Sequence, residues 1–273
     1  MNKIDFSYAS KIEHNFAQRL VIKTIEKLTG KNKLEKIYKD FSKNNYDPRF
    51  FWSGILNSMD IKVTNKSKNN LNIPSKGSLL IIANHPFGII DGLILCSIAS
   101  KTRSDFKIMT HETLRLVPEL DRFILPIEFN LKNKSTIKKN IQTTKIAKKH
   151  LLGGGLLIIF PSGGVSVEKD HDKTMVKDDW KLFTAKIIQQ TKTNVLPIYF
   201  DGKNGFLFNL FATKVKSQTL KYSSYIHETQ KKIGKEIIIY AGKIIEFKDI
   251  EDMKDRTILT NFLKMETYNL IKQ

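Results

Sequence analysis

The sequence has a single cysteine, few acidic residues and no long uninterrupted apolar run. One cysteine, Cys96, excludes a disulfide framework and a cluster of thiolate metal ligands, and it suits a reducing, intracellular compartment. The longest mostly apolar stretch, residues 78–100, is interrupted by Asn84, His85 and Asp91, so we expect no membrane-spanning helix. The first residues lack a basic segment followed by an apolar one, so we expect no secretion signal. If the protein meets a membrane, it should lie on the surface.

The shortage of acidic residues leaves a strongly basic chain. Lysine and arginine number 46 against 27 aspartates and glutamates, and the formal net charge is +19. Such a charge favours an anionic partner, which is nucleic acid, a lipid head-group surface or an acidic carrier protein. Charge alone does not choose among them, and a general bias of the composition toward lysine, isoleucine and asparagine contributes to it as well.

Residues 1–60 form the first predicted unit, an amphipathic helical segment. Apolar residues recur at helical spacing within residues 17–28 and 34–41, and a third helix is predicted to begin at Asp47-Pro48. One side of that helix carries an apolar stripe formed by Phe51, Trp52, Ile55, Leu56 and Met59. The stripe is typical of core packing, although aromatic residues beside Arg49 also suit a lipid head-group interface. We expect this segment to pack on the rest of the chain, with contact to a membrane as one possible role.

Residues 61–273 form the second predicted unit, a single α/β domain. Short apolar runs bounded by glycine, proline, asparagine or aspartate alternate there with helical stretches, which predicts a mixed, largely parallel sheet flanked by helices. The predicted strands are Ser78–Ala83, Phe106–Met109, Ile124–Phe129, Gly155–Phe160, Asn194–Phe200 and Glu236–Ala241. The predicted helices are Gly92–Lys101, Ser135–Leu151, Asp178–Thr191 and residues 250–272.

The first candidate for chemistry is a histidine and an aspartate that follow an apolar strand. His85 and Asp91 lie on a turn that contains Pro86 and Gly88, just before a predicted helix. Sites in α/β sheets gather at the carboxyl ends of strands, and an imidazole oriented by a carboxylate can deprotonate an alcohol or amine. The alternative is structural, with Asp91 as a helix cap and His85 as an ordinary turn residue.

A second strand also ends in a polar turn. The apolar run 156–160 is followed by Pro161-Ser162-Gly163-Gly164-Val165-Ser166. Backbone N–H groups and small hydroxyls in such a turn suit an acceptor head group or the oxyanion of an acyl-transfer intermediate. Alone, a turn of this kind is weak support for a site.

In their order along the chain, these blocks resemble the lysophospholipid (glycerolipid) acyltransferase family, also called the PlsC-like family. The similarity is strongest to a bacterial branch with His-Pro-Phe-Gly and Asp-Gly, termed hemolysin-like or lyso-ornithine-lipid acyltransferase-like. The blocks are Asn84-His85 with Asp91, Phe160-Pro161-Ser162-Gly163 and Val195-Leu196-Pro197-Ile198, with further matches at Val117–Leu120, Asp179–Lys181 and Tyr199–Asn204.

The resemblance implies an O-acyltransferase that moves a fatty acyl chain from a thioester to a lyso-lipid. His85 would be the general base and Asp91 its orienting partner. The implied substrate-binding residues are Asn84, Pro86, Phe87, Gly88, Arg122, Phe160, Pro161, Ser162, Gly163, Gly164 and Ser166. The implied partners are acyl-coenzyme A or acyl carrier protein, a lyso-lipid and an anionic membrane surface, with no metal, bound cofactor or nucleic acid. The implied location is peripheral, on the cytoplasmic face of the inner membrane of a bacterial-type cell.

The sequence departs from the family pattern in three places. Five residues rather than four separate His85 from Asp91, as in the branch named above. Ser162 and Val165 replace the usual acidic residue and arginine, and the second block lacks its downstream arginine. Since these groups normally grip a glycerol phosphate, that acceptor is in question. The candidates to replace them are Arg103, Arg115 and Arg122.

The main rival is a basic binding module without catalysis, in which residues 132–149 and 214–235 contact phosphates. It explains the charge, but it leaves the polar turns at successive strand ends unexplained. Other classes have less support. No Gly-x-Ser-x-Gly is present, His111-Glu112 lacks the second histidine of a zinc site, and Gly153-Gly154-Gly155 lacks the lysine of a phosphate loop.

Overall fold

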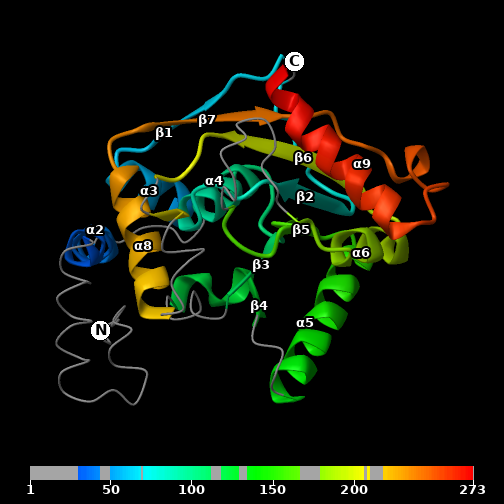
Figure 1. Cartoon of the computed structure of the whole chain (residues 1–273), viewed down its shortest axis with the longest axis horizontal. Coiled ribbons are helices and arrows are strands. Elements are labelled where there is room, and N and C mark those ends of the chain that lie inside the picture. The colour runs from blue at the N-terminus through cyan, green and yellow to red at the C-terminus, as the bar shows by residue number, and fades with distance from the viewer. Residues whose placement is uncertain are drawn as a thin grey trace.

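A seven-stranded sheet organises the chain in the computed structural model, which describes residues 30–43, 50–68, 70–111, 118–128, 134–166, 179–205, 208–209 and 218–272 (Figure 1). The strands are β1 Lys62–Asn65, β2 Leu79–Ala83, β3 Lys107–His111, β4 Ile124–Ile127, β5 Leu156–Ile159, β6 Asn194–Asp201 and β7 Glu236–Ala241, in the order β1-β7-β6-β2-β5-β3-β4. Only β6 and β7 pair antiparallel among these neighbours. The prediction of one α/β domain with a mixed, largely parallel sheet is confirmed.

The two central strands are apolar along their whole length because both faces of the sheet are covered. Every residue of β2 and of β5 is buried. Side chains alternate between the faces of a strand, so Leu79, Ile81 and Ala83 enter one core layer while Leu80 and Ile82 enter the other. The continuous apolar runs seen in the sequence are therefore the signature of buried parallel strands.

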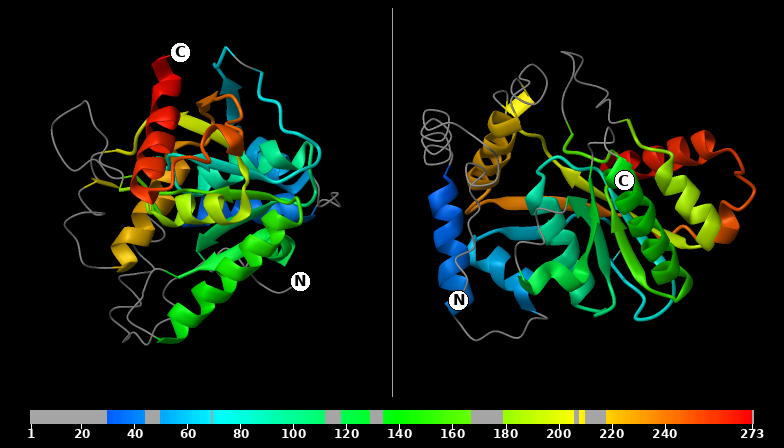
Figure 2. Two further views of the ribbon diagram at one scale, coloured as in Figure 1. Left: turned by 90° about the vertical axis from the view of Figure 1, so that its right-hand side faces the viewer. Right: turned by 90° about the horizontal axis from the view of Figure 1, so that it is seen from below.

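Helices cover the two faces (Figure 2). The layer that contains Ile81 is covered by α3 Phe51–Ser58 and α4 Ile89–Ser100, with α2 Lys31–Lys43 and α8 Gln218–Lys231 packed outside them. The opposite layer is covered by α5 Lys134–Leu152, α6 Phe183–Thr191 and α9 Arg256–Asn269. Three short 3-10 helices complete the described elements: η4 Pro118–Phe123, η5 Phe247–Asp249 and η6 Leu270–Lys272.

The observed and predicted elements differ most in where the helices begin. Local hydrogen bonds explain the difference for two helices, α4 and α9. Helix α4 begins at Ile89 rather than Gly92, because Asp91 in its first turn bonds back to the N–H of Gly88. Helix α9 begins at Arg256 rather than residue 250, because the Asp255 carboxylate caps it. Helix α6 begins at Phe183, within the predicted 178–191.

Some elements were not predicted, and some predictions lie outside the described residues. Strand β1 is short and half-exposed, and α8 is a polar helix, so neither has a strong apolar pattern. The predicted helix at 17–28 and the helix start at Asp47-Pro48 are outside the described part of the chain.

The aromatic stripe of the third predicted helix belongs to the core. Its residues lie on α3 and at its end, and each is at most 7% exposed. The Trp52 ring lies 6.0 Å from that of Phe106 and 5.7 Å from that of Phe123, edge-on. These side chains are therefore not available to a lipid surface, and the core interpretation is the right one. None of the described helices is both long and apolar enough to cross a bilayer.

Candidate active site

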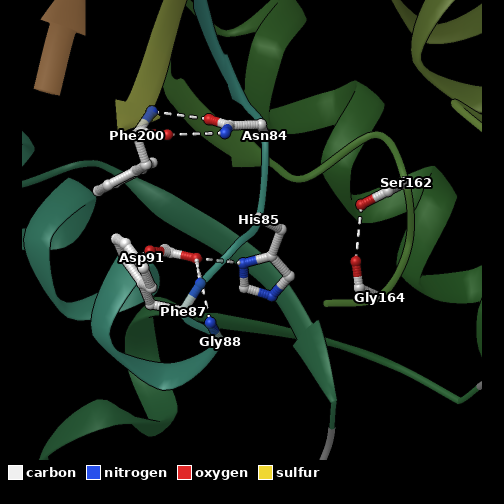
Figure 3. A network of polar contacts seen from close by, with 8 residues as sticks. All are labelled: Asn84, His85, Phe87, Gly88, Asp91, Ser162, Gly164 and Phe200. Atoms are coloured by element: carbon white, nitrogen blue, oxygen red, sulfur yellow. Dashed lines mark hydrogen bonds and ion pairs between the residues drawn. The ribbon is translucent and has the colours of Figure 1, made fainter. Parts of the chain in front are cut away.

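A histidine and an aspartate meet where β2 gives way to α4. His85 Nδ1 lies 3.0 Å from Asp91 Oδ2 (Figure 3). The same oxygen accepts the backbone N–H of Phe87 at 2.8 Å and of Gly88 at 3.1 Å. Gly88 has a φ of 68°, a conformation that favours glycine, and this turn brings the carboxylate onto the imidazole despite five intervening residues. Asp91 thus caps α4 and orients His85 at once, so the two interpretations of this residue are compatible.

The hydrogen bonds determine which ring nitrogen carries the proton. Because Asp91 Oδ2 already accepts two backbone N–H bonds, Nδ1 of His85 is the donor in the third. The lone pair of the neutral imidazole is then on Nε2, on the far side of the ring (Figure 3). No described residue bonds to Nε2, and the His85 side chain keeps 16% of its surface exposed. His85 can therefore accept a proton from a group that approaches this side.

Asp91 is fully buried, and its second oxygen, Oδ1, has no hydrogen-bond partner in the described part of the chain. Burial raises the pKa of the Asp91 carboxyl, while the His85 ring and the two backbone donors act to lower it. A carboxylate that water does not solvate is a strong partner for a positive imidazolium. The buried carboxylate can therefore stabilise a positive charge that forms on the His85 ring during a reaction.

The second predicted turn packs against this histidine. The rings of His85 and Phe160 stack with centroids 3.8 Å apart and planes at 16°. Ser166 N donates to His85 O at 2.8 Å, which ties the turn after β5 to the turn after β2. The neighbouring carboxyl ends of β2 and β5 thus place Phe160 and Ser166 beside His85, as the sequence blocks implied.

The end of β6 completes the surroundings, although the sequence indicated this segment only as a further match to the family pattern. The Asn84 amide exchanges two hydrogen bonds with the backbone of Phe200, at 2.7 and 2.9 Å (Figure 3). Phe87 is buried against Gly202, where a Cβ would lie 2.5 Å from the Phe87 ring. A small recess is lined by Asn84, Pro86, Ser166, Tyr199, Gly202, Lys203, Asn204, Asn209 and Tyr268.

Lys232 is a further basic group near the site that sequence reasoning did not single out. Its Nζ lies 4.1 Å from the centre of the Phe87 ring. Burial lowers the pKa of this amine, and the nearby Glu228 and Asp91 act to raise it. Lys232 lies in a long basic stretch of the sequence, and nothing in that stretch distinguishes it from its neighbours.

Two of the arginines proposed as head-group ligands, Arg122 and Arg103, lie at the opposite edge of the sheet from this site. Arg122 precedes β4, at the amino edge of the parallel strands, whereas His85 follows β2 at the carboxyl edge. Its guanidinium lies 4.5 Å from the Phe123 ring centre, and its carbonyl accepts a bond from Lys107. Arg103 is buried at the same amino edge, where it bonds to Gly77 O and Gly154 O. Arg115 is outside the described residues.

A family model described as Acyltransferase matches residues 61–201, just over half of the chain. The chain belongs to the acyltransferase family. The matched residues of this acyltransferase run from β1 to the end of β6 and include His85, Asp91 and the turn after β5. Among the described residues of the acyltransferase, no cluster of three or more histidine, cysteine, aspartate or glutamate side chains is arranged to hold a metal ion.

Two curated relatives of the acyltransferase carry the name lyso-glycine lipid O-acyltransferase. One is from Phocaeicola vulgatus, with 24% identity over 94% of this chain and 90% of its own length. The other is from Bacteroides thetaiotaomicron, with 23% identity over 94% of this chain and 92% of its own length. Among solved structures, the 1-acyl-sn-glycerophosphate acyltransferase PlsC from Thermotoga maritima aligns with a TM-score of 0.45 and 12% identity, over 93% of this chain and 95% of that one.

Ser162 of the acyltransferase forms a hydrogen bond within its own turn. Its hydroxyl donates to Gly164 O at 2.7 Å, and no bond joins it to His85 among the described residues (Figure 3). We expect Ser162→Ala to lower kcat by less than about tenfold, the equivalent of one ordinary hydrogen bond. Steady-state kinetics would check this value. A loss of several orders of magnitude would instead give Ser162 a direct role in the reaction.

Proposed function

We propose that the protein is an O-acyltransferase that moves a fatty acyl chain from an acyl thioester to the hydroxyl group of a lyso-lipid, with His85 as general base and Asp91 as its orienting partner. The observation that carries the proposal is the 3.0 Å contact between His85 Nδ1 and Asp91 Oδ2 at the carboxyl edge of the sheet, with no described residue bonded to Nε2. The family assignment favours this enzyme over a basic binding module without catalysis.

The proposed reaction has two proton transfers. Nε2 of His85 accepts the proton of the acceptor hydroxyl as its oxygen attacks the thioester carbonyl carbon, and Asp91 stabilises the imidazolium that forms. When the tetrahedral intermediate collapses, the C–S bond breaks and the imidazolium returns the proton to the departing thiolate. The products are an ester and a free thiol. The residues of this chain orient the base and bind the acceptor, and the transfer requires no metal or bound cofactor.

The turn from Phe160 to Gly164 would form one wall of the acceptor site. Phe160 stacks on the imidazole ring, and farther along the same turn Gly163 is half-buried and Gly164 is exposed. Asn84, Pro86 and Ser166 line the adjoining recess, and Phe87 and Gly88 supply the N–H groups that hold Asp91. Residues 61–273 would constitute the catalytic domain, with residues 1–60 as an added helical segment.

We propose a lyso-lipid with an amino-acid head group as the acceptor, and a lyso-glycine lipid as the first one to test. The names of both curated relatives support this class. The absence from the site of Arg103 and Arg122 weakens the case for a glycerol phosphate, because neither guanidinium is there to bind a phosphate. The donor would be acyl-coenzyme A or acyl carrier protein. The enzyme would work peripherally, at the cytoplasmic face of an anionic inner membrane of a bacterial-type cell.

The test is lipid analysis of cells that express the protein, compared with cells that express His85→Ala. We expect a new diacyl lipid in the first and none in the second, and mass spectrometry of that lipid gives the acceptor and the acyl length together. Equal amounts of folded protein in both samples, checked by thermal melting of purified protein, are the control. The same diacyl lipid in both would refute the role of His85, and a new diacyl phosphatidic acid would refute the proposed acceptor class.

A further inference from the structure

Helix α5 presents two faces of different character. Its inner face is formed by Thr136, Thr143, Ala147 and Leu151, all buried against β4, β5 and α6. At about 100° of rotation per residue, Ile137, Ile141 and Leu152 fall within roughly 60° of one another on the outside. They are 42%, 51% and 65% exposed. The helix therefore carries an apolar stripe that no described part of the chain covers.

Lysines flank this stripe, and the helix has no acidic residue. Lys134, Lys138, Lys145 and Lys148 lie in the same outer sector of about 100°. None of these four forms an ion pair with a described residue, whereas Lys139, farther around the helix, pairs with Glu128 at 3.1 Å. We call the seven residues Lys134, Ile137, Lys138, Ile141, Lys145, Lys148 and Leu152 the α5 face. The α5 face combines branched aliphatic side chains with ammonium groups that have no ion-pair partner in the described part of the chain, a composition typical of an interfacial helix.

The amino-terminal half of α5 lies at the same edge of the sheet as the active site. The end of β4 is fastened to the middle of the helix, since Asn140 bonds twice to the backbone of Glu128 and Thr143 bonds to Pro126 O. The turns before Asn140 therefore extend past the carboxyl edge of the sheet, where His85 lies. Figures 1 and 2 show this end of α5 projecting beyond β4. Ile137 lies on this projecting end, and Ile141 lies about one turn farther along, next to Asn140.

We propose that the α5 face docks the protein on an anionic lipid surface, with Ile137 and Ile141 inserted at the level of the head groups. The inference rests on the proposed function in one respect, since a lipid acceptor must come from a membrane. Charge selects the partner: four lysines attract acidic head groups, and each lysine near an anionic surface adds to binding. The α3 stripe is buried in the core, so its aromatic side chains do not offer a second surface for lipid.

The test measures partition of the purified full-length protein onto vesicles by co-sedimentation. Vesicles of phosphatidylglycerol with phosphatidylcholine are compared with vesicles of phosphatidylcholine alone. We expect the wild-type protein to bind the anionic vesicles preferentially, and Ile137→Asn with Ile141→Asn to lower the partition coefficient on the order of tenfold. Ile146→Asn is the matched apolar control, because Ile146 is 44% exposed on a different side of the same helix. It should retain wild-type binding.

A second pair of variants tests whether binding depends on where the lysines lie or only on the net charge. Lys138→Glu with Lys145→Glu should lower binding on the order of tenfold or more. Lys76→Glu with Lys101→Glu makes the same change in net charge at exposed positions beyond the amino ends of the strands, and it should have a much smaller effect. Equal losses in the two charge pairs, or equal losses for Ile146 and for the Ile137 and Ile141 pair, would overturn the proposal, because binding would then depend on total charge or hydropathy alone.

Activity separates docking from catalysis. With acceptor and donor dispersed in detergent micelles, all four variants should match the wild-type rate, whereas on vesicle-borne acceptor the two α5-face variants should be slower. Loss of acyl transfer in His85→Ala with vesicle binding unchanged supports both proposals, and transfer that persists in His85→Ala refutes the catalytic one alone. If the α5-face variants bind vesicles normally but lose rate only with an acyl carrier protein as donor, the face binds the carrier and the docking proposal is wrong.

Discussion

Asp91→Asn is expected to lower kcat by roughly 10²–10³-fold while leaving KM nearly unchanged and the melting temperature undiminished. The change removes one charge and leaves the shape of the side chain. Two backbone donors, Phe87 N and Gly88 N, point at the position of Oδ2 and select the amide oxygen for that place. The amide NH2 then takes the position of Oδ1, which has no partner in the described part of the chain.

Because of this geometry, Asp91→Asn should lower activity only through the loss of the negative charge. With an oxygen still facing Nδ1, the proton of His85 stays on Nδ1 and the lone pair stays on Nε2. What is lost is the attraction between a buried carboxylate and the imidazolium, about 4 kcal/mol for unit charges near 4 Å at an effective dielectric constant near 20. His85→Ala removes the base itself and should cost about 10²–10⁴-fold.

Stability should move in the opposite direction from activity. Burial raises the pKa of the Asp91 carboxyl in the folded protein, so the folded state binds more protons than the unfolded state between the unfolded value of 3.8 and the raised one. Its favourable contribution is complete below the unfolded pKa and is lost as pH rises through the folded pKa. Asparagine does not titrate, so the melting temperature of Asp91→Asn relative to wild type should increase as pH rises above 3.8.

Stopped-flow or steady-state kinetics with melting curves at several pH values would check both halves of this prediction. Asp91→Leu is the contrasting variant, since it strips the two backbone N–H groups of their acceptor and should lower both stability and activity. Normal turnover in Asp91→Asn would remove Asp91 from the mechanism. A melting temperature well below that of wild type at neutral pH would show that the carboxylate is needed to hold the turn.

Arg103→Ala is expected to destabilise the protein by about 3 kcal/mol and to lower its melting temperature by on the order of 10 °C, with little effect on KM. The Arg103 side chain is 1% exposed. Its guanidinium donates to Gly77 O at 2.5 Å and Gly154 O at 2.6 Å, and it grips both oxygens of Asp105. It therefore joins the loops that lead into β2 and β5, the two strands that carry the site residues.

The cost arises mainly from the carbonyl groups that lose their donors, because Asp105 is about half exposed and can be hydrated instead. Arg122→Ala is the matched control: its guanidinium lies on the Phe123 ring, and its loss should cost less than about 1 kcal/mol. Denaturant titration would give both values. Equal stability of the two variants would contradict the role assigned to the Arg103 clamp.

The contact between His85 and Asp91 could be predicted from the sequence because the two residues lie close together along the chain. His85 and Asp91 bracket one turn between a strand and a helix, and the apolar run before them indicates a buried strand. The turn at 160–164 was found in the same way. Their meeting in space follows from parallel strands, whose carboxyl ends share one edge of the sheet.

The arginines could not be placed in this way. Whether an arginine binds a ligand or a backbone carbonyl depends on which loops lie next to it, and the bonds from Arg103 reach Gly77 and Gly154, 26 and 51 residues away. Asn84 and Phe200 are likewise 116 residues apart. Strand β1 has four residues with partly exposed side chains, and α8 is too polar for its apolar spacing to stand out. Such elements form because of contacts between residues that are distant in the sequence, and the local sequence pattern does not reveal those contacts.

Asp91 Oδ2 bonds both to the start of α4 and to His85, so unfolding of this turn and loss of activity should be coupled. The first turn of α4 cannot fray without releasing the imidazole, so turnover should vanish before the sheet unfolds when denaturant is added gradually. The catalytic rate would then report local unfolding of this one turn, whereas a spectroscopic signal averaged over the molecule reports unfolding of the whole sheet.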